Sequence, residues 1–82
     1  MQIMISLKQH QVGKDSKMLH VIVDDGQKIE GTLKVLAEAG LLISGNRPCV
    51  SVRSMRTRRR IPLGKNYREA HVYNGDILTL EE

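Results

Sequence analysis

Apolar and polar residues alternate at the start of the chain. Every second residue from Met1 to Leu7 is apolar, which is the period of a half-buried β-strand. Residues 17–23 are rich in β-branched side chains without a helical period, so they predict a second strand that returns antiparallel to the first. The glycine, aspartate and serine within residues 11–16 predict the turn between the two strands, and residues 24–26 end the second.

The spacing of apolar residues changes between residues 28 and 39. They now recur at i, i+4 and i+7, which places them on one face of a helix. Glu30 lies in the first turn, where the helix dipole favours a negative charge, and Gly40 is a helix-ending signal. The predicted buried stripe consists of Ile29, Leu33 and Leu36, with Val35 and Ala39 alongside.

Short strands and turns follow the helix. The sequence predicts strands at residues 49–54 and 57–63, an irregular segment at 64–72, and a tight turn at 74–76 that leads into a terminal strand. The expected core residues of these segments are Val50, Val52, Ile61, Leu63, Tyr67, Ala70 and Val72.

This order of elements predicts an α+β fold. One helix would cover one face of a mixed sheet of four to five strands, with the first and last strands central and parallel. That is the β-grasp, or ubiquitin-like, arrangement, and we expect it to form a single domain over residues 1–82. At this length the domain buries only about 60–65% of its unfolded surface.

Composition narrows the class of protein. The chain has 40% hydrophobic and 27% charged residues, which is typical of a globular protein. No apolar run approaches the roughly 18–20 residues of a membrane span, and the start of the chain does not resemble a signal peptide. Cys49 is the single cysteine and has no partner for an internal disulfide, so we expect a reduced, cytoplasmic protein.

Several segments together resemble a known family. The start of the chain, its hairpin and its helix are similar to ubiquitin, and the chain as a whole resembles the YukD/EsaB family. Members of that family are small ubiquitin-like proteins encoded with type VII secretion systems of Gram-positive bacteria. The resemblance lies in the helix residues 29–36, the Val-x-Val of residues 50–52 and the Val-Tyr-Asn-Gly-Asp-Ile-Leu of residues 72–78.

The resemblance implies a binding protein rather than an enzyme. Its expected partners are cytoplasmic domains of the membrane secretion machinery, including the secretion ATPase, or regulators of substrate expression. Ubiquitin-like proteins that are conjugated, or that carry sulfur, activate a C-terminal Gly-Gly tail. Here the sequence shows Leu80-Glu81-Glu82 in that place, so we expect neither conjugation nor sulfur transfer.

The net charge of +4 is concentrated in one stretch. No acidic residue lies between Glu38 and Glu69, where the strand parity predicts that Arg53, Arg58 and Arg60 share the sheet face away from the helix. These arginines could solubilise a sheet edge, dock an acidic protein surface or attract nucleic acid. The basic residues of this stretch are Arg47, Arg53, Arg56, Arg58, Arg59, Arg60, Lys65 and Arg68.

Apolar residues on the same predicted face add to this interpretation. Strand parity points Met4, Ile22 and Ile77 away from the helix, beside the arginines. An apolar centre with an arginine rim is typical of protein interfaces, although scattered exposed apolar residues also need no function. We therefore take these residues, with Arg53, Arg58 and Arg60, as the candidate partner-binding site; exposed strand edges also allow a homodimer.

A small basic RNA-binding domain is the alternative function. Charge alone supports it, because Tyr67 and Tyr73, the only aromatic residues that could stack on bases, lie outside the arginine-rich stretch. Catalysis, a metal and a cofactor are not expected. His10, His20 and His71 lie in separate segments without metal-site spacing, and Cys49 is best explained as a core or edge residue.

Overall fold

The computed structural model describes residues 1–11, 14–41 and 49–81 and contains five strands and one helix. Their bounds are β1 Gln2–Gln11, β2 Lys14–Asp24, α1 Ile29–Glu38, β3 Ser51–Ser54, β4 Arg60–Pro62 and β5 Ile77–Glu81. Among the described residues, no helix has the length and apolar character needed to cross a membrane.

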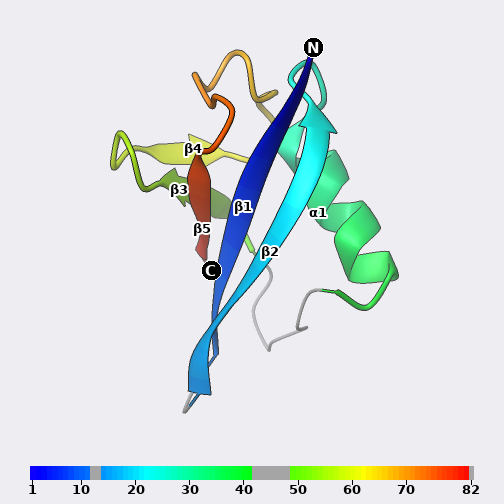
Figure 1. Cartoon of the computed structure of the whole chain (residues 1–82), viewed down its shortest axis with the longest axis vertical. Helices are drawn as coiled ribbons and strands as arrows, with labels where there is room; N and C mark the ends of the chain where they lie inside the picture. Colours follow the sequence, from blue (N-terminus) through cyan, green and yellow to red (C-terminus); the bar gives the residue numbers. More distant parts are fainter. Residues whose placement is uncertain (12–13, 42–48, 82) are drawn as a thin grey trace.

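The strands form one mixed sheet in the order β2-β1-β5-β3-β4 (Figure 1). The two terminal strands lie at its centre and run parallel, with Leu7 beside Leu78, whereas every other pairing is antiparallel. The sheet and the single helix confirm the predicted α+β fold, which is compatible with a β-grasp arrangement.

The core lies between α1 and one face of the sheet. Ile29, Leu33 and Leu36 are buried as the stripe predicted, but Val35 and Ala39 are exposed, so the stripe is narrower than expected. Thr32 takes the remaining buried position of the helix. The apolar members of the core are Ile3, Ile5, Leu7, Val23, Ile29, Leu33, Leu36, Val52, Ile61, Tyr67, Val72 and Leu78.

Gly40 ends the helix as predicted. Its φ of 74° is left-handed, and its N–H donates to the carbonyl of Ala37 while the N–H of Leu41 donates to that of Leu36. These two bonds satisfy carbonyls at the helix end that have no partner within the helix. Glycine adopts this backbone conformation without a steric cost.

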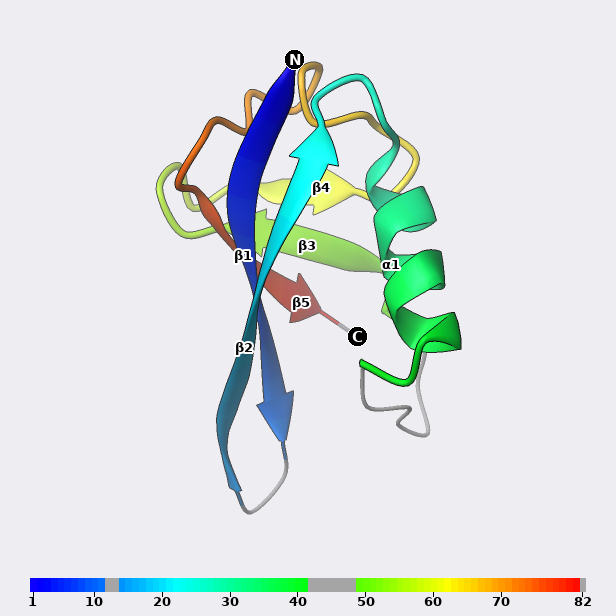
Figure 2. The ribbon, with the colours of Figure 1, turned by 45° about the vertical axis from the view of Figure 1, so that its right-hand side comes forward.

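The first hairpin is longer than predicted. We expected a turn over residues 11–16, but β1 continues to Gln11 and β2 begins at Lys14. Backbone pairing persists with a register shift between Gln9 and Gln11, because hydrogen bonding between strands does not require alternating apolar residues. The far part of the hairpin consequently extends beyond the rest of the sheet (Figure 2).

The strands of the second half are shorter than predicted. β3 begins at Ser51, and Val50 before it is exposed rather than part of the core. The predicted strand 57–63 is reduced to β4, because the chain turns after Ser54, whose carbonyl accepts the N–H of Arg58 at 2.7 Å. The predicted anchors Tyr67 and Val72 are buried, and Ala70 and Leu63 are half-buried against the core.

Candidate functional site

The face of the sheet opposite α1 carries exposed apolar residues. Met4 of β1 and Ile22 of β2 are direct cross-strand partners, and they are 51% and 68% exposed. Ile77 of β5 is paired with Ser6, two residues along β1 from Met4, and is half-buried. We call this side of the sheet the open face.

Met55 extends this apolar surface toward the arginines. Its N–H donates to the carbonyl of Ile77 at 2.9 Å, and its sulfur accepts a hydrogen bond from the Thr79 hydroxyl at 3.4 Å. The side chain is half exposed. Ile22, Met4, Ile77 and Met55 therefore form a row, which we call the apolar strip. Sequence reasoning missed Met55, although it shares the outward parity of Ser51 and Arg53.

A polar group interrupts the open face beside the strip. The hydroxyl of Ser6 and Nδ1 of His20 lie 2.7 Å apart, between the Met4–Ile22 pair and the exposed Met18. The hydrogen bond fixes the imidazole against β1. His20 is thus part of the open face.

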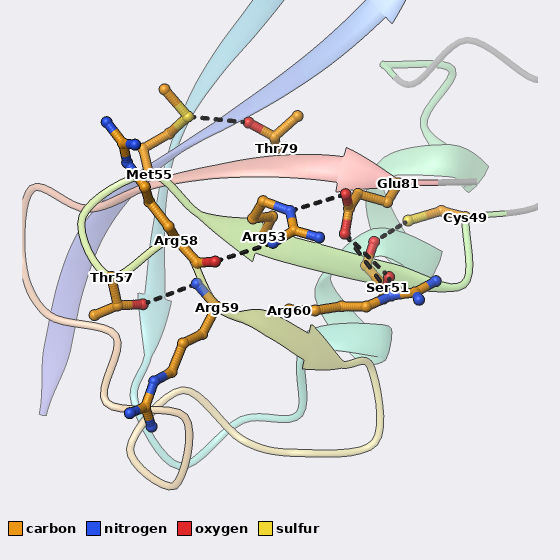
Figure 3. A network of polar contacts seen from close by, with 10 residues as sticks. All are labelled: Cys49, Ser51, Arg53, Met55, Thr57, Arg58, Arg59, Arg60, Thr79 and Glu81. Atoms are coloured by element: carbon orange, nitrogen blue, oxygen red, sulfur yellow. Dashed lines mark hydrogen bonds and ion pairs between the residues drawn. The ribbon is translucent and has the colours of Figure 1, made fainter.

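Arg53 and Arg60 lie side by side on the open face and share one carboxylate (Figure 3). Nε of Arg53 lies 3.0 Å from Glu81, and Nε of Arg60 lies 3.8 Å from it. Arg60 also donates to the hydroxyl of Ser51 at 2.8 Å, and this serine is buried beneath the arginines. Glu81 therefore orders these arginines and offsets part of their charge, a role that sequence reasoning did not assign.

Arg58 is placed differently from the prediction. It lies in the turn before β4 with a left-handed φ of 59°, not on a strand, so strand parity does not apply to it. Its carbonyl accepts a hydrogen bond from Arg53 at 2.9 Å, which connects the turn to the open face. In Figure 3 its side chain runs toward the side where Met55 lies, while Arg59 reaches in the opposite direction.

Two other arginines stabilise loops. Arg56 donates to Asp76 at 2.9 Å and to the carbonyl of His71 at 2.6 Å, and its guanidinium lies 4.9 Å from the centre of the Tyr73 ring. Arg68 donates to Asp25 at 2.9 Å. This hydrogen bond is the main cause that lowers the pKa of Asp25 from 3.8 to about 2, with help from the amino group of Met1.

The predicted basic stretch therefore divides into paired and unpaired residues. Arg53, Arg56, Arg60 and Arg68 have carboxylate partners. Within residues 1–11, 14–41 and 49–81, no carboxylate pairs with Arg58, Arg59 or Lys65. Arg47 lies outside the described residues.

A hollow of about 540 Å³ lies beside β4. Arg59, Arg60 and Lys65 line it together with His71 and Tyr73 from the segment after β4. Tyr73 is outside the arginine-rich stretch in sequence, but the fold brings its half-exposed ring to the same hollow as these cations.

The histidines and Cys49 are the remaining residues that the sequence offers for metal binding or catalysis. In the described part of the chain, no three histidine, cysteine, aspartate or glutamate residues are placed to hold a metal ion. Cys49 is half-buried against the core and its thiol donates to the carbonyl of Ser51 at 3.2 Å. The side chain of His10 lies outside the described residues.

Comparison with models of known protein families finds no match. A search among curated proteins likewise finds no relative. The resemblance to the YukD/EsaB family thus stays a prediction that rests on the quoted segments.

Proposed function

We propose that this chain is a non-catalytic, ubiquitin-like binding module whose open face docks a protein partner with an acidic surface. The observation that supports this most is the apolar strip, in which Met4 and Ile22 stay exposed on a sheet whose other face packs into the core. The buried centre of an interface is more apolar than the rest of a protein surface, and methionine and arginine are enriched among its residues.

The positive charge of the arginines at the end of the strip indicates that the partner's surface is negatively charged. Glu81 holds Arg53 and Arg60 in place, so fewer rotamers are lost when a partner binds. Arg58 has no carboxylate partner in the described part of the chain and contributes a positive charge at the rim. An acidic surface complements this arrangement in position and sign.

The family resemblance supports a more specific setting. In the setting that this resemblance implies, the chain is a cytoplasmic accessory or regulatory component of a type VII secretion system. Its partner is then a cytoplasmic domain of the membrane machinery, with the domain of the secretion ATPase as the first candidate.

The test measures binding of the purified chain to a purified cytoplasmic domain of that ATPase by calorimetry. We expect Ile22→Ser and the double variant R58E/R60E each to weaken binding by about tenfold or more, since each alters the centre or the rim of the interface. Lys34→Glu, on the exposed side of α1, is the control and should leave the affinity unchanged. Equal affinity of all variants would refute the open face as the docking site.

RNA binding is the second candidate function, and the position of Tyr73 favours it. Its half-exposed ring, with Arg56 over it at 4.9 Å, lines the same hollow as the unpaired Arg59 and Lys65, which sequence reasoning did not foresee. An exposed ring beside a basic groove suits base stacking. This function predicts that the purified chain binds a fluorescent single-stranded RNA, with an affinity that falls steeply as salt rises. RNA binding that survives at high salt, or none at low salt, would contradict it.

A further inference from the structure

The hollow beside β4 is separate from the apolar strip. It lies between β4, the turn that precedes it and the segment that follows it, and neither Met4, Ile22 nor Ile77 lines it. In Figure 3, Arg59 leaves the turn before β4 in the direction opposite to Arg58, away from the side where Met55 lies. The hollow therefore offers a second surface with its own chemistry.

Its charge is strongly positive. Four cationic side chains line it, from Arg56, Arg59, Arg60 and Lys65, with Glu69 as the one lining carboxylate. Asp76 and Glu81 pair with Arg56 and Arg60, so among the described residues the uncompensated charge is that of Arg59 and Lys65. The Glu69 carboxylate is engaged, because it accepts the N–H of Asn66 at 3.2 Å. The side chains of Arg59 and Lys65 make no hydrogen bond or ion pair with any described residue, so their charges are available to a ligand.

The edge of β4 does not suit an added peptide strand. Pro62 has no N–H to donate, and its carbonyl already accepts the N–H of Lys65 at 3.3 Å. An extended peptide that pairs with this edge would gain few backbone hydrogen bonds. Recognition in the hollow therefore depends on side chains.

These side chains suit an anion that carries several charges. Arginine forks and lysine ammonium groups both bind phosphate oxygens. One carboxylate carries charge for one of the unpaired cations, whereas a chain of phosphates carries enough negative charge for both Arg59 and Lys65. The volume of about 540 Å³ is within the range of small-molecule sites.

We propose that the hollow beside β4 binds a small ligand with a chain of phosphoryl groups, held by Arg59 and Lys65. The ligand is either an inorganic oligophosphate or a nucleoside triphosphate, which share this chemistry. A nucleoside would in addition place its base on the Tyr73 ring, which Arg56 holds in position from 4.9 Å.

The test uses the full chain and follows backbone amide signals by NMR as tripolyphosphate or ATP is added. We expect saturable shifts at Thr57, Arg59, Lys65 and His71, and small shifts at Met4 and Ile22. The double variant R59Q/K65Q should weaken the affinity for tripolyphosphate by about tenfold or more. The matched control R58Q/K34Q removes the same charge from exposed positions that do not line the hollow, and it should change the affinity less than about twofold.

Two further measurements complete the test: the effect of Tyr73→Leu on both probes, and the affinity for a hexaglutamate peptide. Tyr73→Leu weakens ATP but not tripolyphosphate if the base stacks, and it leaves both unchanged if the phosphoryl chain alone is recognised; either result agrees with the proposal. Three results would overturn it: no saturable binding of either probe, equal losses in the two double variants, or tighter binding of a hexaglutamate peptide than of tripolyphosphate.

Discussion

Met4 and Ile5 are neighbours in β1, yet they have opposite environments. Ile5 is fully buried beneath α1, whereas Met4 is half exposed on the open face. A weaker contrast separates Leu78, which is fully buried, from Ile77, which is half-buried, on β5. Side-chain type does not distinguish these pairs, because all four residues are apolar. The position of the single helix decides which of them stabilises the fold and which remains available to a partner.

Polar groups on the two faces also differ in their exposure to solvent. Beneath the helix, the buried Tyr67 hydroxyl donates to Thr32 at 2.8 Å, and Thr32 also accepts from Gln27. On the open face, Arg53 and Arg60 share Glu81 while remaining exposed. The covered face pairs polar groups because their burial would otherwise cost free energy. On the open face the pairing orients charges toward solvent, where a partner can reach them.

The largest expected effect tests whether the covered face alone carries stability. Leu78→Ala should lower the free energy of unfolding by about 2–5 kcal/mol, because it leaves a cavity in the core. Ile22→Ala on the open face should change it by about 0.5 kcal/mol or less. Urea unfolding measures both changes. If L78A does not fold, Ile5→Val replaces it as the core variant, with an expected loss of about 0.5–1.5 kcal/mol in the free energy of unfolding. Similar losses at Leu78 and Ile22 would remove the distinction between the faces.

The conformation at the end of the helix provides a second test. Gly40→Ala should destabilise the protein by about 1–2 kcal/mol, since its φ of 74° strains a residue with a Cβ. A Cβ there would contact nothing within 4 Å, so the loss is conformational. Gly31→Ala within α1 should instead stabilise by about 0.4–1 kcal/mol, because a Cβ there meets only Gln27 at an ordinary 3.8 Å. Thermal unfolding compares each variant with the parent protein. A change in stability of the same sign in both variants would contradict this account.

A smaller effect is expected from the polar pair under the helix. Tyr67→Phe removes one hydrogen bond and keeps the ring, and it should lower the free energy of unfolding by about 1 kcal/mol. Thr32 retains its bond from Gln27, so no buried acceptor loses every partner. Thr32→Val provides the reciprocal variant. A Tyr67→Phe variant as stable as the parent in urea would show that this pair contributes no stability.

The smallest expected effect concerns an exposed ion pair away from both faces. Asp25 has a pKa of about 2 in the fold against an ordinary 3.8, so its contribution to stability is present above pH 4 and is lost as the pH falls toward 2. Arg68→Gln removes the main cause and should raise the pKa of Asp25 toward 3.8. NMR titration of the carboxyl measures this. An unchanged pKa in the variant would assign the shift to the amino group of Met1 instead.

The pattern of apolar residues was sufficient to predict the fold. Alternation in the first strand, the i, i+4, i+7 stripe of the helix and the order of elements are local signals, and the structure confirms the α+β arrangement that follows from them. The predictions were wrong at positions whose environment depends on contacts between distant parts of the chain. Val35 fits the stripe by spacing but is exposed, because one helix on one sheet buries only a narrow face. The left-handed turn at Arg58 contains no glycine, so nothing in the sequence indicated it.

The candidate site was predictable only in part. Strand parity predicted the outward positions of Met4, Ile22, Ile77, Arg53 and Arg60, which the structure places together on the open face. Parity failed for Arg58, because parity has meaning only within a strand. Whether these residues bind a partner stays a prediction that the proposed experiments test.

By itself the sequence determined which residues are apolar, where they recur and hence which elements form, since the periods of strands and helices involve neighbours along the chain. Only the tertiary structure decided which charges are paired. The carboxylates that bind Arg53, Arg56 and Arg68 lie 28, 20 and 43 residues away in sequence. Charges at such separations meet only after the chain has folded. For that reason Arg59 and Lys65 are distinguished from Arg53, Arg56, Arg60 and Arg68 by the fold, and not by their type or spacing.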